Sequence, residues 1–159
     1  MFVTDELFYE KLDYLNNRLA EALLEAGKKP LLQGNIFYAP GQTLGHNLDS
    51  NCNTKRERFS RAVEGKHTMF EIGINGGHSS LLALISNPNL VIYGNDIAQS
   101  FRNFHMDIYV PVACEVLQEL FPGRFEYIFG DCLKVVPEFV KDNPNIKFDV
   151  VHIDGTKDN

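Results

Sequence analysis

Residues 71–80 read E-I-G-I-N-G-G-H-S-S, and the prediction of the fold starts from this segment. The segment T-M-F precedes it at 68–70, and the apolar segment L-L-A-L-I follows it at 81–85. A short apolar run, a glycine-rich turn and a second apolar segment are typical of a β-strand that turns tightly into an α-helix. We therefore predict a strand over 68–73 and a helix over 78–85.

The same alternation continues toward the C-terminus. Apolar runs at 90–94, 125–129 and 148–153 predict three further strands, and helical patterns at 107–121 and 132–141 lie between them. Strands that alternate with helices form a parallel sheet with right-handed crossovers. The predicted fold class is α/β, with a Rossmann-like, doubly wound parallel sheet.

The first 66 residues have a different pattern. Apolar residues recur every three or four positions over 5–26, which predicts an amphipathic helix, and a shorter helix is expected over 54–63. Residues 31–53 are rich in Gly, Asn, Pro and Ser, as in a long functional or mobile loop. We predict an N-terminal helical extension and loop over 1–66 and a partial Rossmann-like domain over 67–159.

Composition excludes several classes of protein. The 159 residues carry a net charge of −6, so the basic surface that nucleic acid requires is not expected. No apolar run is long enough to span a bilayer, and the start of the chain lacks the pattern of a signal peptide. The three cysteines contain no C-x-x-C pair, which disfavours a zinc site. We expect a cytoplasmic protein that binds neither nucleic acid nor membranes.

Polar residues follow each predicted strand, and a parallel sheet brings such residues to one edge, where ligands bind. The dinucleotide fingerprint G-x-G-x-x-G, counted from Gly73, would require glycine where this chain has Asn75 and His78. Asp96 lies about 20 residues further on, where a carboxylate can accept both hydroxyls of a ribose. The two missing glycines weaken the prediction of an NAD-dependent oxidoreductase, which remains an alternative, whereas the carboxylate at Asp96 is expected in a site for any adenosine-containing cofactor.

The E-I-G-I-N-G-G-H-S-S stretch resembles the first motif of class I S-adenosylmethionine-dependent methyltransferases. It is similar to the E-x-G-x-x-x-G-x-S form of catechol and caffeoyl-CoA O-methyltransferases, and to the E-I-G-F-N-A-G-H-S form of a family of small methyltransferases. F-D-V-V-H-I-D-G at 148–155 is similar to F-D-L-I-H-I-D-G of that second family. The resemblance covers residues 67–159 and implies methyl transfer from S-adenosylmethionine to a small molecule, at oxygen.

The resemblance also implies roles for individual residues. Gly73 and Gly77 would pass under the methionine part of the cofactor, and Ser79 would hold its carboxylate. Glu71 would orient the loop or bind the amino group, and Asp96 would bind the ribose. The full set of implied cofactor-binding residues is Glu71, Gly73, Asn75, Gly77, His78, Ser79, Asp96 and Asp131, the last beside the adenine.

The final residues D-G-T-K-D-N resemble D-A-D-K-D-N of the cation-dependent O-methyltransferases. By that resemblance Asp154 is a candidate ligand of Mg²⁺, which prefers oxygen donors, and Lys157 is a candidate base toward the acceptor hydroxyl. The second family has Gly-x-His at this point, whereas this chain has Gly155-Thr156-Lys157.

The sequence supplies four of the seven strands of a class I methyltransferase. The expected fold is therefore incomplete after the fourth strand, as in a fragment of a longer protein. An exposed edge strand could instead be covered in a homodimer. A further alternative is a non-catalytic remnant that retains only cofactor binding.

Overall fold

The computed structural model describes residues 6–155 of the chain. Four parallel strands form one sheet in the order β3-β2-β1-β4. The strands are β1 (Thr68–Ile72), β2 (Val91–Asp96), β3 (Phe125–Phe129) and β4 (Val150–Ile153). Every consecutive pair is connected through a helix, which confirms the predicted Rossmann-like α/β fold.

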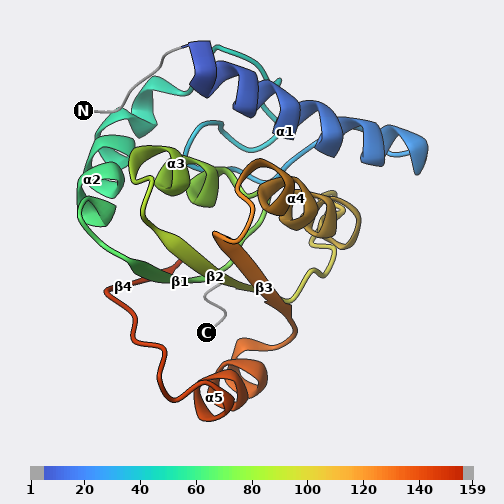
Figure 1. Ribbon diagram of the computed structural model, residues 1–159. Helices are drawn as coiled ribbons and strands as arrows, with labels where there is room; N and C mark the ends of the chain where they lie inside the picture. The colour runs from blue at the N-terminus through green and yellow to red at the C-terminus, as the bar shows by residue number, and fades with distance from the viewer. Residues whose placement is uncertain (1–5, 156–159) are drawn as a thin grey trace.

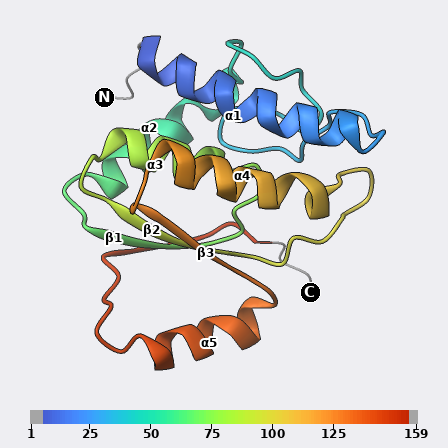
Figure 2. The same cartoon turned by 45° about the vertical axis from the view of Figure 1, so that its right-hand side comes forward.

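The helices lie on both faces of the sheet (Figure 1). One face carries α2 (Asn53–Val63), α3 (His78–Ser86) and α4 (Met106–Leu120), and α1 (Glu6–Glu25) packs on α3 and α4 as an outer layer. The opposite face carries α5 (Cys132–Asp142), as the turned view in Figure 2 shows. The predicted elements agree with these bounds within one or two residues at most ends.

The N-terminal segment shares its hydrophobic core with the sheet. The amphipathic stripe of α1 is fully buried, as its period predicts, and consists of Phe8, Leu12, Leu15, Leu19 and Leu23. These side chains belong to the same cluster of buried residues as the inner faces of α3 and α4. Residues 6–66 therefore help to form the layer that covers the sheet.

The long segment between α1 and α2 is a loop, as its composition predicts, but it is packed against the rest of the chain. It contains one short 3-10 turn, η1 (Ser50–Cys52), and is otherwise irregular. Four of its apolar side chains are nevertheless buried in the core, namely Leu32, Ile36, Phe37 and Tyr38. The segment is fixed by packing, and it lies against the turn that follows β1.

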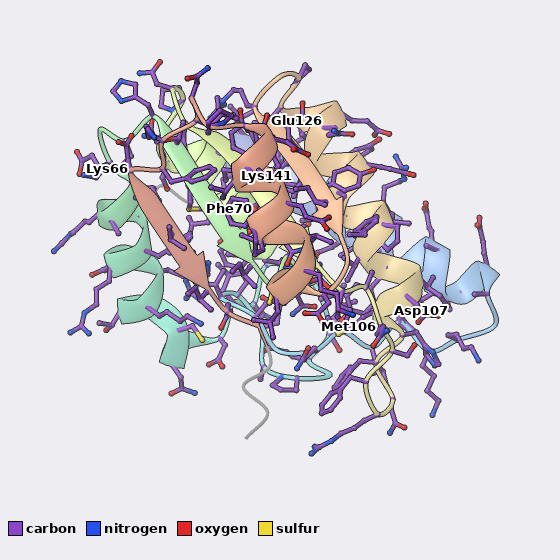
Figure 3. All side chains as sticks on the ribbon, turned by 90° about the horizontal axis from the view of Figure 1, so that it is seen from below. Lys66, Phe70, Met106, Asp107, Glu126 and Lys141 are labelled. Atoms are coloured by element: carbon purple, nitrogen blue, oxygen red, sulfur yellow. The ribbon has the colours of Figure 1, made fainter. Side chains whose placement is uncertain are left out.

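An aromatic cluster joins α5 to the sheet. Phe139 of α5 and Phe148 before β4 pack against Phe70 and Tyr93, with ring centroids 5.1–5.8 Å apart. Figure 3 views the sheet from this side and labels Phe70 on β1 and Lys141 on α5.

Val151 on β4 is exposed, and within the described residues β4 pairs with β1 alone.

Candidate functional site

The four strands are parallel, so their carboxyl ends meet at one edge of the sheet. Backbone hydrogen bonds connect the turns that follow the strands. These bonds run from Gly73 N to Asn95 O, from Gly130 N to Asp96 O and from Asp154 N to Ile72 O, at 2.8–2.9 Å. The predicted meeting of the strand ends at one edge is confirmed.

Gly73 begins the turn after β1 and has a φ of +94°, which L side chains rarely adopt. A Cβ atom at this position would lie 2.8 Å from the backbone carbonyl of Asp154 and from the N atom of Gly155. Gly77 ends the turn with a φ of +77°, and a Cβ there would lie 3.0 Å from Leu117. Both glycines are therefore required by backbone conformation and by close approach.

Asp96 lies against this turn. Its Oδ2 atom accepts a hydrogen bond from the backbone N–H of Asn75 at 2.9 Å, and its Oδ1 atom accepts one from the N–H of Ala98 at 2.8 Å. The residue is only 4% exposed, and these two hydrogen bonds hold the turn after β1 and the backbone after β2 in place. Each carboxylate oxygen can accept a second hydrogen bond, which leaves acceptor capacity for a ligand hydroxyl.

Glu71 is fully buried on β1 and anchors the first turn of α3. Its carboxylate accepts hydrogen bonds from the hydroxyls of Ser79 and Ser80. Ser80 is not among the predicted site residues. The sequence feature that points to it is a second hydroxyl side chain, next to Ser79, in the first turn of the helix. Because the Ser79 hydroxyl is used by Glu71, the groups of this turn that suit an anion are backbone N–H groups at the start of α3.

His152 on β4 is the third partner of Glu71. The two residues are opposite each other in the β1–β4 ladder, and His152 Nδ1 lies 2.9 Å from Glu71 Oε1. The ring of Phe59 from α2 packs on the imidazole at 4.8 Å. Burial lowers the pKa of His152, but the hydrogen bond and negative charge of Glu71 raise it by more, so the pKa lies above 6.5.

His78 lies in the helical layer, under α1. It is 1% exposed, its Nε2 atom is 2.9 Å from Asn16 Oδ1, and its ring packs edge-on against Phe37 and Tyr38. Burial lowers the pKa of His78 to about 3, so the ring is neutral at physiological pH. The side chain of His78 is thus enclosed by N-terminal residues, and we assign it to packing rather than to the ligand edge.

Asp131 caps α5, because its carboxylate accepts a hydrogen bond from the N–H of Leu133 at 3.0 Å. Two exposed apolar side chains lie at the same edge, and sequence reasoning did not identify them. Ile97 follows Asp96 directly and is 49% exposed, and Leu133 is 82% exposed. An apolar residue directly after a strand-end carboxylate was the available signal.

Asp154 lies at the end of β4, where Lys55 Nζ approaches its Oδ2 atom at 3.9 Å in a half-exposed ion pair. Within residues 6–155, no group of three or more His, Cys, Asp or Glu side chains could hold a metal ion. One lysine-paired carboxylate does not by itself supply the oxygen-rich donor set that Mg²⁺ requires, so the described residues do not support the predicted magnesium site. Lys157 lies outside the described residues.

Comparisons with known proteins agree in fold and differ widely in sequence. No protein-family model and no curated protein sequence matches the chain. Three similar solved structures are all described as methyltransferases. They are a Plasmodium falciparum protein described as a protein-L-isoaspartate O-methyltransferase, in complex with S-adenosyl-L-homocysteine (TM-score 0.54, 13% identity), one described as an O-methyltransferase from Klebsiella pneumoniae (0.53, 17%), and the calicheamicin methyltransferase CalS11 (0.53, 18%).

The class of fold follows from these findings. The chain has a Rossmann-like α/β fold that is similar to the fold of these three proteins. The alignments cover 99%, 96% and 96% of this chain, but 69%, 63% and 69% of the three neighbours. None of the helices in the described part of the chain is long and apolar enough to cross a membrane.

Proposed function

We propose that this chain binds S-adenosylmethionine and belongs to an enzyme that transfers its methyl group to an oxygen atom of a small molecule. One observation carries the proposal. The carboxylate at the end of β2 is hydrogen-bonded to the glycine-bearing turn after β1, at the ligand edge of a fold shared with three methyltransferases. One of those proteins is in complex with S-adenosyl-L-homocysteine.

In this proposal the turn and the first strand hold the amino-acid part of the cofactor. The backbone at Gly73 and Gly77 passes close beneath it, in a turn whose shape depends on both glycines, because a Cβ at either position would meet Asp154 or Leu117. Backbone N–H groups at the start of α3 receive its carboxylate, and Glu71 holds Ser79 and the rest of this helical turn in place. The buried negative charge of Glu71 lies near the place where a positively charged cofactor would bind.

The second and third strands would hold the adenosine. The remaining lone pairs of the Asp96 carboxylate accept the ribose hydroxyls. Ile97 and Leu133 contribute apolar surface for the flat faces of the adenine, and the capping interaction of Asp131 fixes the start of α5 beside it. The site therefore has polar groups for the charged amino-acid part of the cofactor at one end and apolar side chains for its adenine at the other.

When bound, the cofactor supplies an electrophilic methyl group on sulfur. The residues of the chain act by positioning, since a correctly oriented acceptor oxygen reacts far faster than a freely diffusing one. Lys157 is the proposed base that takes the proton from the acceptor hydroxyl. Asp154, directly after β4, would lie beside the bound acceptor. Magnesium has no part in the proposal.

Calorimetry separates the proposed function from its main alternative. The purified chain is titrated with S-adenosylhomocysteine and, separately, with NAD. The proposal predicts saturable binding of S-adenosylhomocysteine and at least tenfold weaker binding of NAD, because Asn75 and His78 occupy fingerprint positions where NAD-binding turns have glycine. Preferential NAD binding would establish the oxidoreductase alternative.

The acceptor is tested by transfer of a tritiated methyl group from S-adenosylmethionine to panels of small hydroxyl-, amino- and thiol-bearing compounds. We expect label on hydroxyl compounds. In the Lys157→Met variant, transfer should fall at least tenfold while the affinity for S-adenosylhomocysteine stays unchanged. Transfer to amines alone would contradict the assignment to oxygen, and binding without any transfer would support the non-catalytic alternative.

A further inference from the structure

The turn after β1 is held by residues that lie outside the sheet. Asn75, in the middle of the turn, has a φ of +53°, a left-handed conformation that non-glycine residues adopt at a cost. Asparagine tolerates this conformation better than most residues because its side chain can bond locally. Here, however, its side chain bonds to two distant parts of the chain.

The first part is α4. Tyr109 is completely buried there, and its hydroxyl donates a hydrogen bond to Asn75 Oδ1 at 2.8 Å. Burial raises the pKa of Tyr109, so the phenol keeps the proton that it donates. Its oxygen lies 3.5 Å from the backbone N–H of Gln33.

The second part is the segment between α1 and α2. Asn75 Nδ2 donates to the carbonyl oxygen of Gly34 at 3.3 Å. The amide of Asn75 thus lies between a buried phenol and a backbone carbonyl, and the backbone N–H of the same residue donates to Asp96. The turn is therefore held by three hydrogen bonds of Asn75, to Tyr109 of α4, to Gly34 of the segment between α1 and α2, and to Asp96 of β2. We call this set of bonds the clamp.

We propose that Tyr109 is a positioning residue for the ligand-binding turn, and that it acts through Asn75 with the help of the N-terminal segment. The proposal deepens the proposed function and rests on it for its ligand. It makes Gln33 and Gly34 a part of the site, because these two residues of the segment between α1 and α2 contact Tyr109 and Asn75. It also explains why an asparagine occupies a left-handed position that glycine could occupy without strain.

The test uses a matched pair of tyrosines. Tyr38 is also buried, but its hydroxyl bonds to Gly45 O and Asn16 Nδ2, neither of which belongs to the turn at 73–77. Tyr109→Phe and Tyr38→Phe each remove one buried hydroxyl, so both should lower thermal stability. Calorimetry should show S-adenosylhomocysteine binding weakened about tenfold by Tyr109→Phe and less than twofold by Tyr38→Phe. Equal effects of the two variants on affinity would overturn the proposal.

A glycine variant provides the rescue. In Asn75→Gly the turn adopts its conformation without the side-chain clamp, so adding Tyr109→Phe should change the affinity by less than twofold. A tenfold loss that persists in this background would mean that Tyr109 acts by another route.

A readout without ligand keeps this inference separate from the proposed function. Amide hydrogen exchange at Asn75, followed by NMR, should be at least fivefold faster in Tyr109→Phe than in the wild type and unchanged in Tyr38→Phe. Unchanged exchange in Tyr109→Phe would overturn the clamp, whether or not S-adenosylhomocysteine binds. Faster exchange in a protein that does not bind S-adenosylhomocysteine would retain the clamp and refute the cofactor.

Discussion

The Asp96 carboxylate accepts a hydrogen bond from the backbone N–H of Asn75 at 2.9 Å. This bond joins the end of β2 to the middle of the turn after β1, although the residues belong to different βα units. A ligand that contacts both the turn and the carboxylate would therefore meet a site that is already assembled. Such preorganisation lowers the entropic cost of binding, because the turn and the carboxylate need not be ordered when the ligand binds.

The close approach at Gly73 predicts a large loss of stability on substitution. Gly73→Ala combines a left-handed φ with a Cβ 2.8 Å from the backbone of Asp154, so the free energy of unfolding should fall by about 3 kcal/mol or more. Gly27→Ala is the control, because it has a left-handed φ of +69° but no atom within 4 Å. Its cost should be about 1 kcal/mol. Urea denaturation measures both, and equal losses would mean that Asp154 does not constrain Gly73.

The buried His78 predicts a loss of stability in mild acid. Because its pKa falls from 6.5 to about 3 on folding, the unfolded chain binds a proton that the folded chain does not. Stability should be unaffected by this residue above pH 6.5 and should decrease toward pH 3, by about 1.4 kcal/mol per pH unit. His78→Gln should remove this contribution. Denaturation curves at pH 7 and pH 5 test it, and an identical pH dependence of both proteins would contradict the burial of the ring.

The pair of Glu71 and His152 predicts the opposite pH dependence. The pKa of His152 is raised on folding, so its pairing stabilises the protein fully below pH 6.5 and ceases to do so as pH rises through the folded pKa. An NMR titration of the His152 ring should give a pKa above 6.5 in the wild type. In Glu71→Gln, where the charge is absent, the pKa should be lower. No difference between the two proteins would mean that Glu71 does not control His152.

Much of the fold could be predicted because the signals are local. The period of α1 determines its buried stripe, and the alternation of apolar runs with helical patterns determines the parallel sheet. The glycines of the turn belong to a contiguous motif at 71–80, and the structure gives Gly73 and Gly77 the left-handed backbone that glycine adopts most readily. The strands, the helices and the glycine-bearing turn are therefore predictable from the sequence, because each depends on residues that are close together in the chain.

The rest depends on contacts between distant residues. The pairing of Glu71 with His152 follows from strand register, and the burial of His78 follows from the packing of α1 over α3. Residues 31–38 have a loop composition, yet they pack in the core through Leu32 and Ile36 and contact the turn. A local pattern contains no information on such contacts, so Tyr109 was not identified either.

Calorimetric titration of S-adenosylhomocysteine into two aspartate variants tests directly whether Asp96 binds the cofactor. Asp96→Ala removes the carboxylate beside the turn. Asp149→Ala removes a carboxylate that likewise accepts backbone N–H bonds, from His67 and Thr68, but at the amino-terminal edge of the sheet. We predict affinity at least about 30-fold weaker in Asp96→Ala, as the loss of charge-assisted hydrogen bonds implies, and unchanged in Asp149→Ala. Equal affinity in both variants would contradict a cofactor site at Asp96.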